Sequence, residues 1–131
     1  MNCPVCAAPL IAVERDRVEV DSCISCRGLW FDRGELELLC EQSSVPLNMG
    51  KLFTAAGVVS EKPRHCPRCN QRMAKVALSS NTRLVTDHCP DEHGIWFDAR
   101  ELGAVIDHAA RQHGAAPPVV RFLGEVFGKE V

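Results

Sequence analysis

The stretch from residue 23 to residue 36 returns, in modified form, from residue 89 to residue 102. Both copies contain Gly-x-Trp-Phe-Asp and then, after two intervening residues, Glu-Leu, so that Trp30 recurs as Trp96 and its neighbours recur at the same spacing. The chain has only two tryptophans, so their recurrence within the same motif is not a chance match. The chain of 131 residues is therefore a tandem repeat. Each of the two small units can bury only a limited apolar core and needs a further source of stability.

Cysteine pairs supply that source in the first unit. The interval between its two Cys-x2-Cys turns, from Cys6 to Cys23, fits the spacing of a four-cysteine zinc ribbon. The predicted ligands are Cys3, Cys6, Cys23 and Cys26. A pair of structural disulfides is the alternative. The first residues lack the basic start and apolar segment of a secretory signal, so we expect a cytoplasmic protein, in which disulfides are rare.

The second unit offers three cysteines and a less obvious fourth ligand. Cys66, Cys69 and Cys89 repeat the pattern, but Glu92 stands where the first unit has its fourth cysteine. We favour the next residue, His93, because structural zinc binds imidazole far more readily than carboxylate. Glu92 itself and His88 remain alternatives. The cofactors predicted are therefore two structural zinc ions, and four-ligand sites leave no open position for catalysis.

The residues around the cysteines predict short strands and helices. In each unit a β-hairpin and a third strand are expected, at residues 10–13, 18–20 and 29–31 and at 73–78, 82–86 and 96–97. Asp32 with Glu35, and Asp98 with Glu101, have the spacing of a capping box, so a helix should follow each third strand. The apolar spacing of residues 119–131 predicts an amphipathic C-terminal helix. The fold class is a small metal-stabilised α+β protein with two three-stranded antiparallel ribbons.

This pattern divides the chain into four segments. Residues 1–42 form the first ribbon with its helix, 43–63 a connector, 64–114 the second ribbon with its helix, and 115–131 the C-terminal segment. The connector is rich in Gly, Pro and Ser, but residues 47–59 are apolar enough for one short helix. No apolar run approaches the roughly 20 residues needed to cross a bilayer.

Charge is distributed unevenly over the two units. The formal net charge is −2, and thiolates bound to zinc would make it more negative, which opposes general nucleic-acid binding. Residues 14–41 are mainly acidic, whereas residues 62–86 contain no acid. The basic residues of this run are a candidate nucleic-acid site: Lys62, Arg64, Arg68, Arg72, Lys75 and Arg83. They include no aromatic residue for stacking on bases, so a solvated basic face is the alternative.

The complete pattern of Cys-Pro-x-Cys, hairpin, Cys-x2-Cys and Gly-x-Trp-Phe-Asp-x-Gly-Glu-Leu resembles the bacterial transcription factor zinc-finger family, named for its likeness to the zinc ribbon of transcription factor IIB. Two copies cover about residues 3–40 and 66–103. The resemblance implies zinc on the four cysteines of the first copy. The second copy departs from the pattern at Glu92 and His93, and at residues 99–100, where Ala-Arg replaces Arg-Gly.

These observations predict a non-enzymatic zinc-binding protein that acts as an interaction module. We expect a protein-binding adaptor linked to transcription, because the apolar connector and C-terminal segment favour protein contacts. Nucleic-acid binding through residues 62–83 is the alternative. A thiol redox enzyme or a zinc hydrolase is a third class, disfavoured by the doubled cysteine pairs and by closed metal sites. The sequence leaves the oligomeric state open.

Overall fold

A computed structural model describes residues 1–15, 18–42, 53–57, 62–78, 81–98 and 101 of the chain. The expected C-terminal helix, and the helix after the second ribbon beyond Glu101, lie outside these residues. No helix in the described residues has the length and hydropathy of a membrane span. The division of the chain at residues 42, 63 and 114 stays a prediction.

The strands expected from the sequence are confirmed in both units. The first unit contains β1 (Ile11–Arg15), β2 (Val18–Ser22) and β3 (Leu29–Asp32), and the second contains β5 (Ala74–Leu78), β6 (Asn81–His88) and β7 (Gly94–Phe97). One short helix, α1 (Glu35–Gln42), follows β3 and packs against β2 and β3. Its first turn carries two glutamates, which suits the positive end of the helix dipole.

The connector differs from the expectation. Residues 53–55 form a strand, β4 (Phe53–Ala55), so the short helix predicted over residues 47–59 is wrong at this point. The strand pairs antiparallel with β5 and buries Phe53, whose ring meets the imidazole of His88 edge to face at a centroid distance of 5.1 Å. Tertiary pairing thus outweighs the local pattern, because residues 53–55 pair with β5 and the Phe53 ring is buried against His88.

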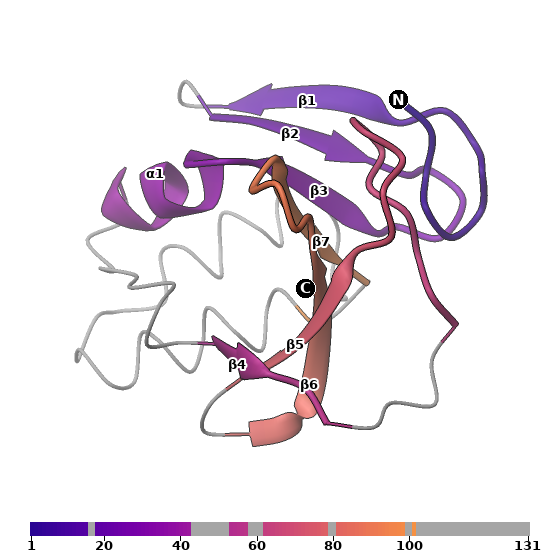
Figure 1. Cartoon of the computed structure of the whole chain (residues 1–131). Helices are drawn as coiled ribbons and strands as arrows, with labels where there is room; N and C mark the ends of the chain where they lie inside the picture. The colour runs from indigo at the N-terminus through magenta and orange to yellow at the C-terminus, as the bar shows by residue number, and fades with distance from the viewer. Residues whose placement is uncertain (16–17, 43–52, 58–61, 79–80, 99–100, 102–131) are drawn as a thin grey trace.

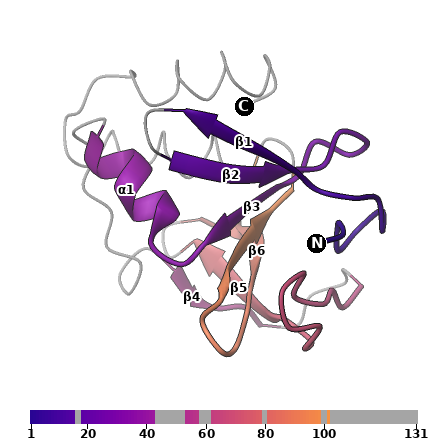
Figure 2. The ribbon, with the colours of Figure 1, turned by 90° about the horizontal axis from the view of Figure 1, so that it is seen from above.

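The seven strands in the described part of the chain belong to one antiparallel sheet, in the order β1-β2-β3-β7-β6-β5-β4. The two ribbons therefore share one sheet, joined where β3 pairs with β7. Figures 1 and 2 show the strands of the first unit crossing the direction of those of the second, with α1 on the flank of β2 and β3. The turns at residues 3–6 and 66–69 lie side by side near the N-terminus, whereas the loops at 23–28 and 89–94 lie at opposite ends of the β3–β7 ladder (Figure 1).

The pairing of β3 with β7 has approximate two-fold symmetry. Trp30 lies opposite Trp96, and the neighbouring pairs are Leu29 with Phe97 and Phe31 with Ile95. Exchanging each residue for its counterpart in the other repeat reproduces the same register, as in an isologous interface between identical subunits. The Phe31 and Phe97 rings meet edge to face, with centroids 5.9 Å apart. The two units thus face each other as the halves of a symmetric dimer would.

This register places one row of side chains across six strands, on one face of the sheet. Cross-strand partners point to the same face, so each pair in the ladder extends the row. From β1 to β5 the row reads Ala12, Asp21, Trp30, Trp96, Asp87 and Lys75. It is palindromic except at its ends, where Ala12 stands in the place that corresponds to Lys75.

The two glycines of the repeated motif allow this close approach. A Cβ at Gly28 would overlap the indole of Trp96, and a Cβ at Gly94 would overlap the Phe31 carbonyl and the indole of Trp30. Each unit therefore provides the glycine that makes room for the tryptophan of the other. Both indoles are fully buried.

We expect Gly94→Ala to destabilise the metal-loaded protein by about 1–3 kcal/mol, the usual cost of overfilling a packed core. The backbone carbonyl of Phe31 cannot move aside without breaking the β3–β7 ladder. The measurement is urea denaturation followed by tryptophan fluorescence. Gly57→Ala is the matched control, since a Cβ at Gly57 has open space around it. Equal stability of the two variants would contradict this packing.

Candidate metal centres

The four cysteines predicted in the first unit come together in the structure. Their sulfur atoms all lie within 4.8 Å of one another. Cys3 and Cys23 are buried, Cys26 is half-buried and Cys6 is exposed. Tight turns hold the loops, with the amides of Val5 and Cys6 each donating to the Cys3 sulfur at 3.3 Å. Amide donors of this kind stabilise thiolate charge.

The second unit gathers three cysteines and one histidine. Cys66, Cys69, Cys89 and His93 place their ligand atoms within 4.8 Å of one another. The Cys89 sulfur lies 3.2 Å from Nδ1 of His93. The two alternatives lie elsewhere: Glu92 is exposed and faces the Arg33 guanidinium at 3.5 Å, and the His88 ring packs on Phe53.

A one-residue difference between the loops explains why the histidine enters the cluster. In the first unit the amide of Arg27 bonds the Cys23 carbonyl, and Arg27 has a positive φ of 64°. In the second unit the turn closes one residue earlier, since the amide of Glu92 bonds the Cys89 carbonyl with φ at 60°. In the first unit the side chain that points into the cluster is the third residue after Cys23, which is Cys26. In the second unit the tighter turn brings in the fourth residue after Cys89, which is His93.

The thiols of each cluster have divergent acidities. Burial opposes ionisation of Cys23, but the amide of Cys26 and neighbouring groups outweigh it and lower the pKa to about 7. Burial raises the pKa of Cys26. In the second cluster burial again opposes ionisation of Cys89, yet local amides lower its pKa to about 7, while burial raises the pKa of Cys66 to about 12. Crowded thiols can all ionise together only when a cation sits between them.

The geometry fits a tetrahedral zinc ion. A Zn–S distance of about 2.3 Å implies sulfur atoms about 3.8 Å apart in a tetrahedron. The Cys3 and Cys26 sulfurs are 3.7 Å apart, and those of Cys69 and Cys89 are 3.6 Å apart. Each cluster could hold one metal ion in a closed four-ligand set.

The two clusters share their surroundings. Trp30, Trp96 and Met73 pack with the buried cysteines of both units in one apolar core cluster. Each indole N–H donates to the aspartate two residues later, from Trp30 to Asp32 at 2.9 Å and from Trp96 to Asp98 at 3.1 Å. The repeated Trp-Phe-Asp motif therefore fixes the indoles that lie between the two metal centres.

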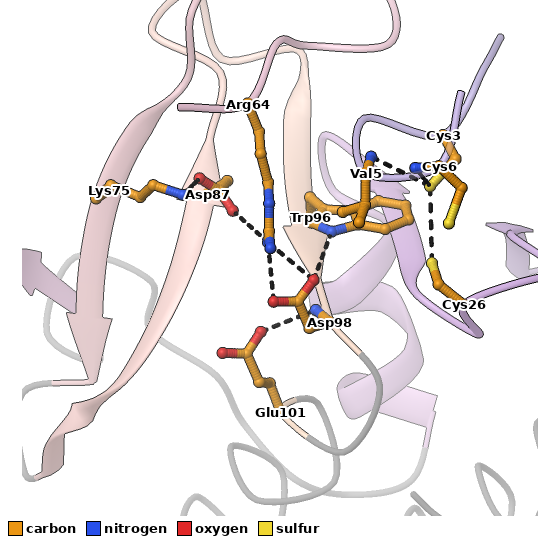
Figure 3. A network of polar contacts seen from close by, with 10 residues as sticks. All are labelled: Cys3, Val5, Cys6, Cys26, Arg64, Lys75, Asp87, Trp96, Asp98 and Glu101. Carbon is orange, nitrogen blue, oxygen red and sulfur yellow. Dashed lines mark hydrogen bonds and ion pairs between the residues drawn. The ribbon is translucent and has the colours of Figure 1, made fainter. Parts of the chain in front are cut away.

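The basic run does not form a continuous cationic surface in the described residues. Arg64 pairs with Asp87 at 3.3 Å and with Asp98 at 2.8 Å, and Lys75 pairs with Asp87 at 2.6 Å (Figure 3). Arg68 forms two hydrogen bonds with Asp32 of the other unit. The remaining members of the run are Lys62 and Arg72, which are exposed, and Arg83, whose side chain lies outside the described residues.

Two important residues escaped the sequence interpretation. Asp21 and Asp87 are 6% and 1% exposed, and they flank the paired tryptophans in the central row. The sequence does show that they belong to the repeat, because these two aspartates are separated by the same number of residues as the two tryptophans. Their role could not be inferred, since the cations that pair with Asp87 lie far from it in sequence.

Two pairs of cysteine-bearing turns on an antiparallel sheet define a tandem zinc ribbon. The model of the transcription factor zinc-finger family, of the TFIIB zinc-ribbon type, matches residues 2–42 and 65–108. The chain belongs to this family, in two copies. No curated protein and no solved structure matches it significantly.

We expect His93→Ala to weaken metal binding at the second site by more than the roughly tenfold cost of losing an outer-shell partner. The readout is titration with Co²⁺, whose visible absorption distinguishes a sulfur-only site from a site with one nitrogen ligand. Glu92→Gln is the control and should bind like the parent protein. The assignment of the ligand is wrong if Glu92→Gln weakens the site and His93→Ala does not.

Proposed function

We propose that this chain is a non-catalytic, zinc-loaded adaptor that binds a protein partner of the transcription machinery. Zinc on each cluster supplies folding free energy, of order 10 kcal/mol for small sites of this kind. The membership of the transcription factor zinc-finger family supports the link to transcription. The shared sheet supports a rigid surface, because both ribbons are fixed to each other by the β3–β7 ladder.

The observation that carries the choice of a protein partner is the ion pairing of the basic run. Arg64, Arg68 and Lys75 are engaged by aspartates, so these charges are largely neutralised within the molecule. A nucleic-acid site needs cations available to phosphate groups. Arg64 and Lys75 are also poorly accessible, with side chains 17% and 15% exposed.

Nucleic-acid binding through residues 62–83 is the competing proposal. Its strongest support is the pair of exposed cations Lys62 and Arg72, which flank the turn at residues 66–69 in the sequence. An enzymatic role has less support. Each cluster offers four potential protein ligands, and a zinc hydrolase requires an open position for water.

The test compares three states of the full chain: zinc-loaded, stripped with a chelator, and reloaded with zinc. We expect the zinc-loaded chain to capture a defined set of proteins from nuclease-treated extract, identified by quantitative mass spectrometry. Capture should disappear on stripping and return on reloading, because the metal holds the ribbons folded. Retention of partners and of tryptophan near-ultraviolet signals after complete stripping would contradict a structural metal.

The same preparation distinguishes the nucleic-acid alternative by fluorescence anisotropy with labelled single-stranded and duplex oligonucleotides. Our proposal predicts no tight binding at physiological salt. The informative variant is Lys62→Ala with Arg72→Ala, because these side chains are exposed and their loss leaves the internal ion pairs intact. Tight binding that falls steeply with salt and is lost in this variant would favour nucleic acid as the partner.

A further inference from the structure

The outermost ribbon strands of the two units, β1 and β5, differ in whether another described strand pairs with them. In the second unit, β4 adds to the free edge of β5, with Thr54 opposite Ala77 and Ala55 opposite Val76. Beyond the strand, the amide of Ala56 still donates to the Lys75 carbonyl at 3.1 Å. In the first unit β1 is the equivalent strand, and it ends the sheet with no neighbour on its outer side in the described part of the chain.

The row of side chains that runs from Ala12 to Lys75 also ends differently in the two units. In the second unit the buried Asp87 is neutralised by Lys75 from β5 and by Arg64. In the first unit Ala12 occupies the place of Lys75, because it lies opposite Asp21 as Lys75 lies opposite Asp87. The place of Arg64, two positions before the first cysteine of its unit, is taken by Met1.

Among the described residues, Asp21 is thus without a direct cationic partner. It is 6% exposed, and no described residue forms a hydrogen bond or ion pair with its side chain. Arg68 and the N-terminal amine act on it only from farther away, and Arg68 is already bonded to Asp32. Burying an unpaired carboxylate costs folding free energy. At the equivalent position in the second unit, Asp87 is paired with Arg64 and Lys75.

Further acidic groups surround this position. Glu14 and Glu19 lie directly opposite each other on β1 and β2, on the same face as Ala12 and Asp21. Both glutamates are exposed. Like charges in this arrangement repel each other. The corresponding pair in the second unit is apolar, Ala77 with Val85, so the acidic face is special to the first unit.

Glu35, at the start of α1, lies close to the same carboxylates. Burial raises its pKa to about 7, and the nearby carboxylates of Asp32, Asp21 and Glu19 contribute further. One of its carboxylate oxygens is buried with no hydrogen-bond partner among the described residues. Carboxyl groups are therefore concentrated around Asp21 in the described part of the first unit.

We infer that the β1 edge binds an extended, lysine-containing segment of the protein partner, which adds to the sheet as β4 adds to β5. A lysine opposite Ala12 would reach over its small, exposed side chain and place its ammonium group at Asp21, as Lys75 does at Asp87. A second lysine two positions away would face Glu14 and Glu19. Main-chain hydrogen bonds supply affinity in strand addition, and alternate side chains supply specificity.

This inference deepens the proposed adaptor function, on which it rests, by naming the chemistry of its partner. The test uses the zinc-loaded full chain and a short peptide, acetyl-Thr-Lys-Val-Lys-Thr-Val-amide, in an NMR titration. We expect saturable shifts of the β1 amides and of the Trp30 indole N–H. The same peptide with norleucine in place of both lysines should bind about tenfold more weakly or worse, since it loses the charge-assisted contacts.

Ala12→Lys is the decisive variant, because it supplies the missing cation from within the chain. It should weaken peptide binding at least about tenfold and raise the thermal midpoint by a few degrees, as expected for relief of an unpaired buried charge. Ile11→Lys is the matched control, since Ile11 is an exposed residue of the same strand that points to the opposite face. It should change neither property in this way.

Three results would overturn the inference. These are equal binding of the lysine and norleucine peptides, unchanged binding by Ala12→Lys, and saturation of the same resonances by Mg²⁺ or Ca²⁺ in place of the peptide. The adaptor function is tested separately by protein capture. If Ala12→Lys still captures the same proteins in a zinc-dependent manner, the adaptor function stands and the lysine-binding edge does not.

Discussion

The pairing of β3 with β7 is the interaction on which the rest of the structure depends. It joins two ribbons, each too small for a substantial core, into one sheet. It also buries both tryptophans between the cysteine clusters, where Gly28 and Gly94 make room for them. The metal centres and the β3–β7 interface are therefore parts of one body, and a disturbance of the interface reaches the packing around both clusters.

The local features of the fold could be predicted from the sequence, because they depend on neighbouring residues. Cysteine spacing indicated both clusters, and β-prone runs on either side of a turn indicated the strands at 73–78 and 82–86. The pairing of the two ribbons could not be predicted, since it depends on shape complementarity between segments that lie far apart along the chain. The strand at Phe53–Ala55 was missed for the same reason: its stability comes from β5.

The sequence alone did not show how the charges of the basic run are paired. The run from Lys62 to Arg83 looked like a surface for an external anion, yet three of its members bind aspartates of this chain. Sequence proximity shows only that cations are concentrated, whereas burial decides what they contact. Asp87 is 1% exposed and pairs with both Arg64 and Lys75, so these cations are needed to keep a carboxylate inside the protein.

The palindromic row has a consequence for what a duplicated chain can do. In a symmetric dimer of one repeat, both ends of the row would carry the same side chain, because one gene segment would encode them both. Two copies within a single chain are free to diverge. Here one end has Lys75 and the other Ala12, so Asp87 has a lysine beside it in the row and Asp21 has an alanine. Covalent duplication thereby lets the two ends of the sheet differ, which the symmetry of a homodimer would not allow.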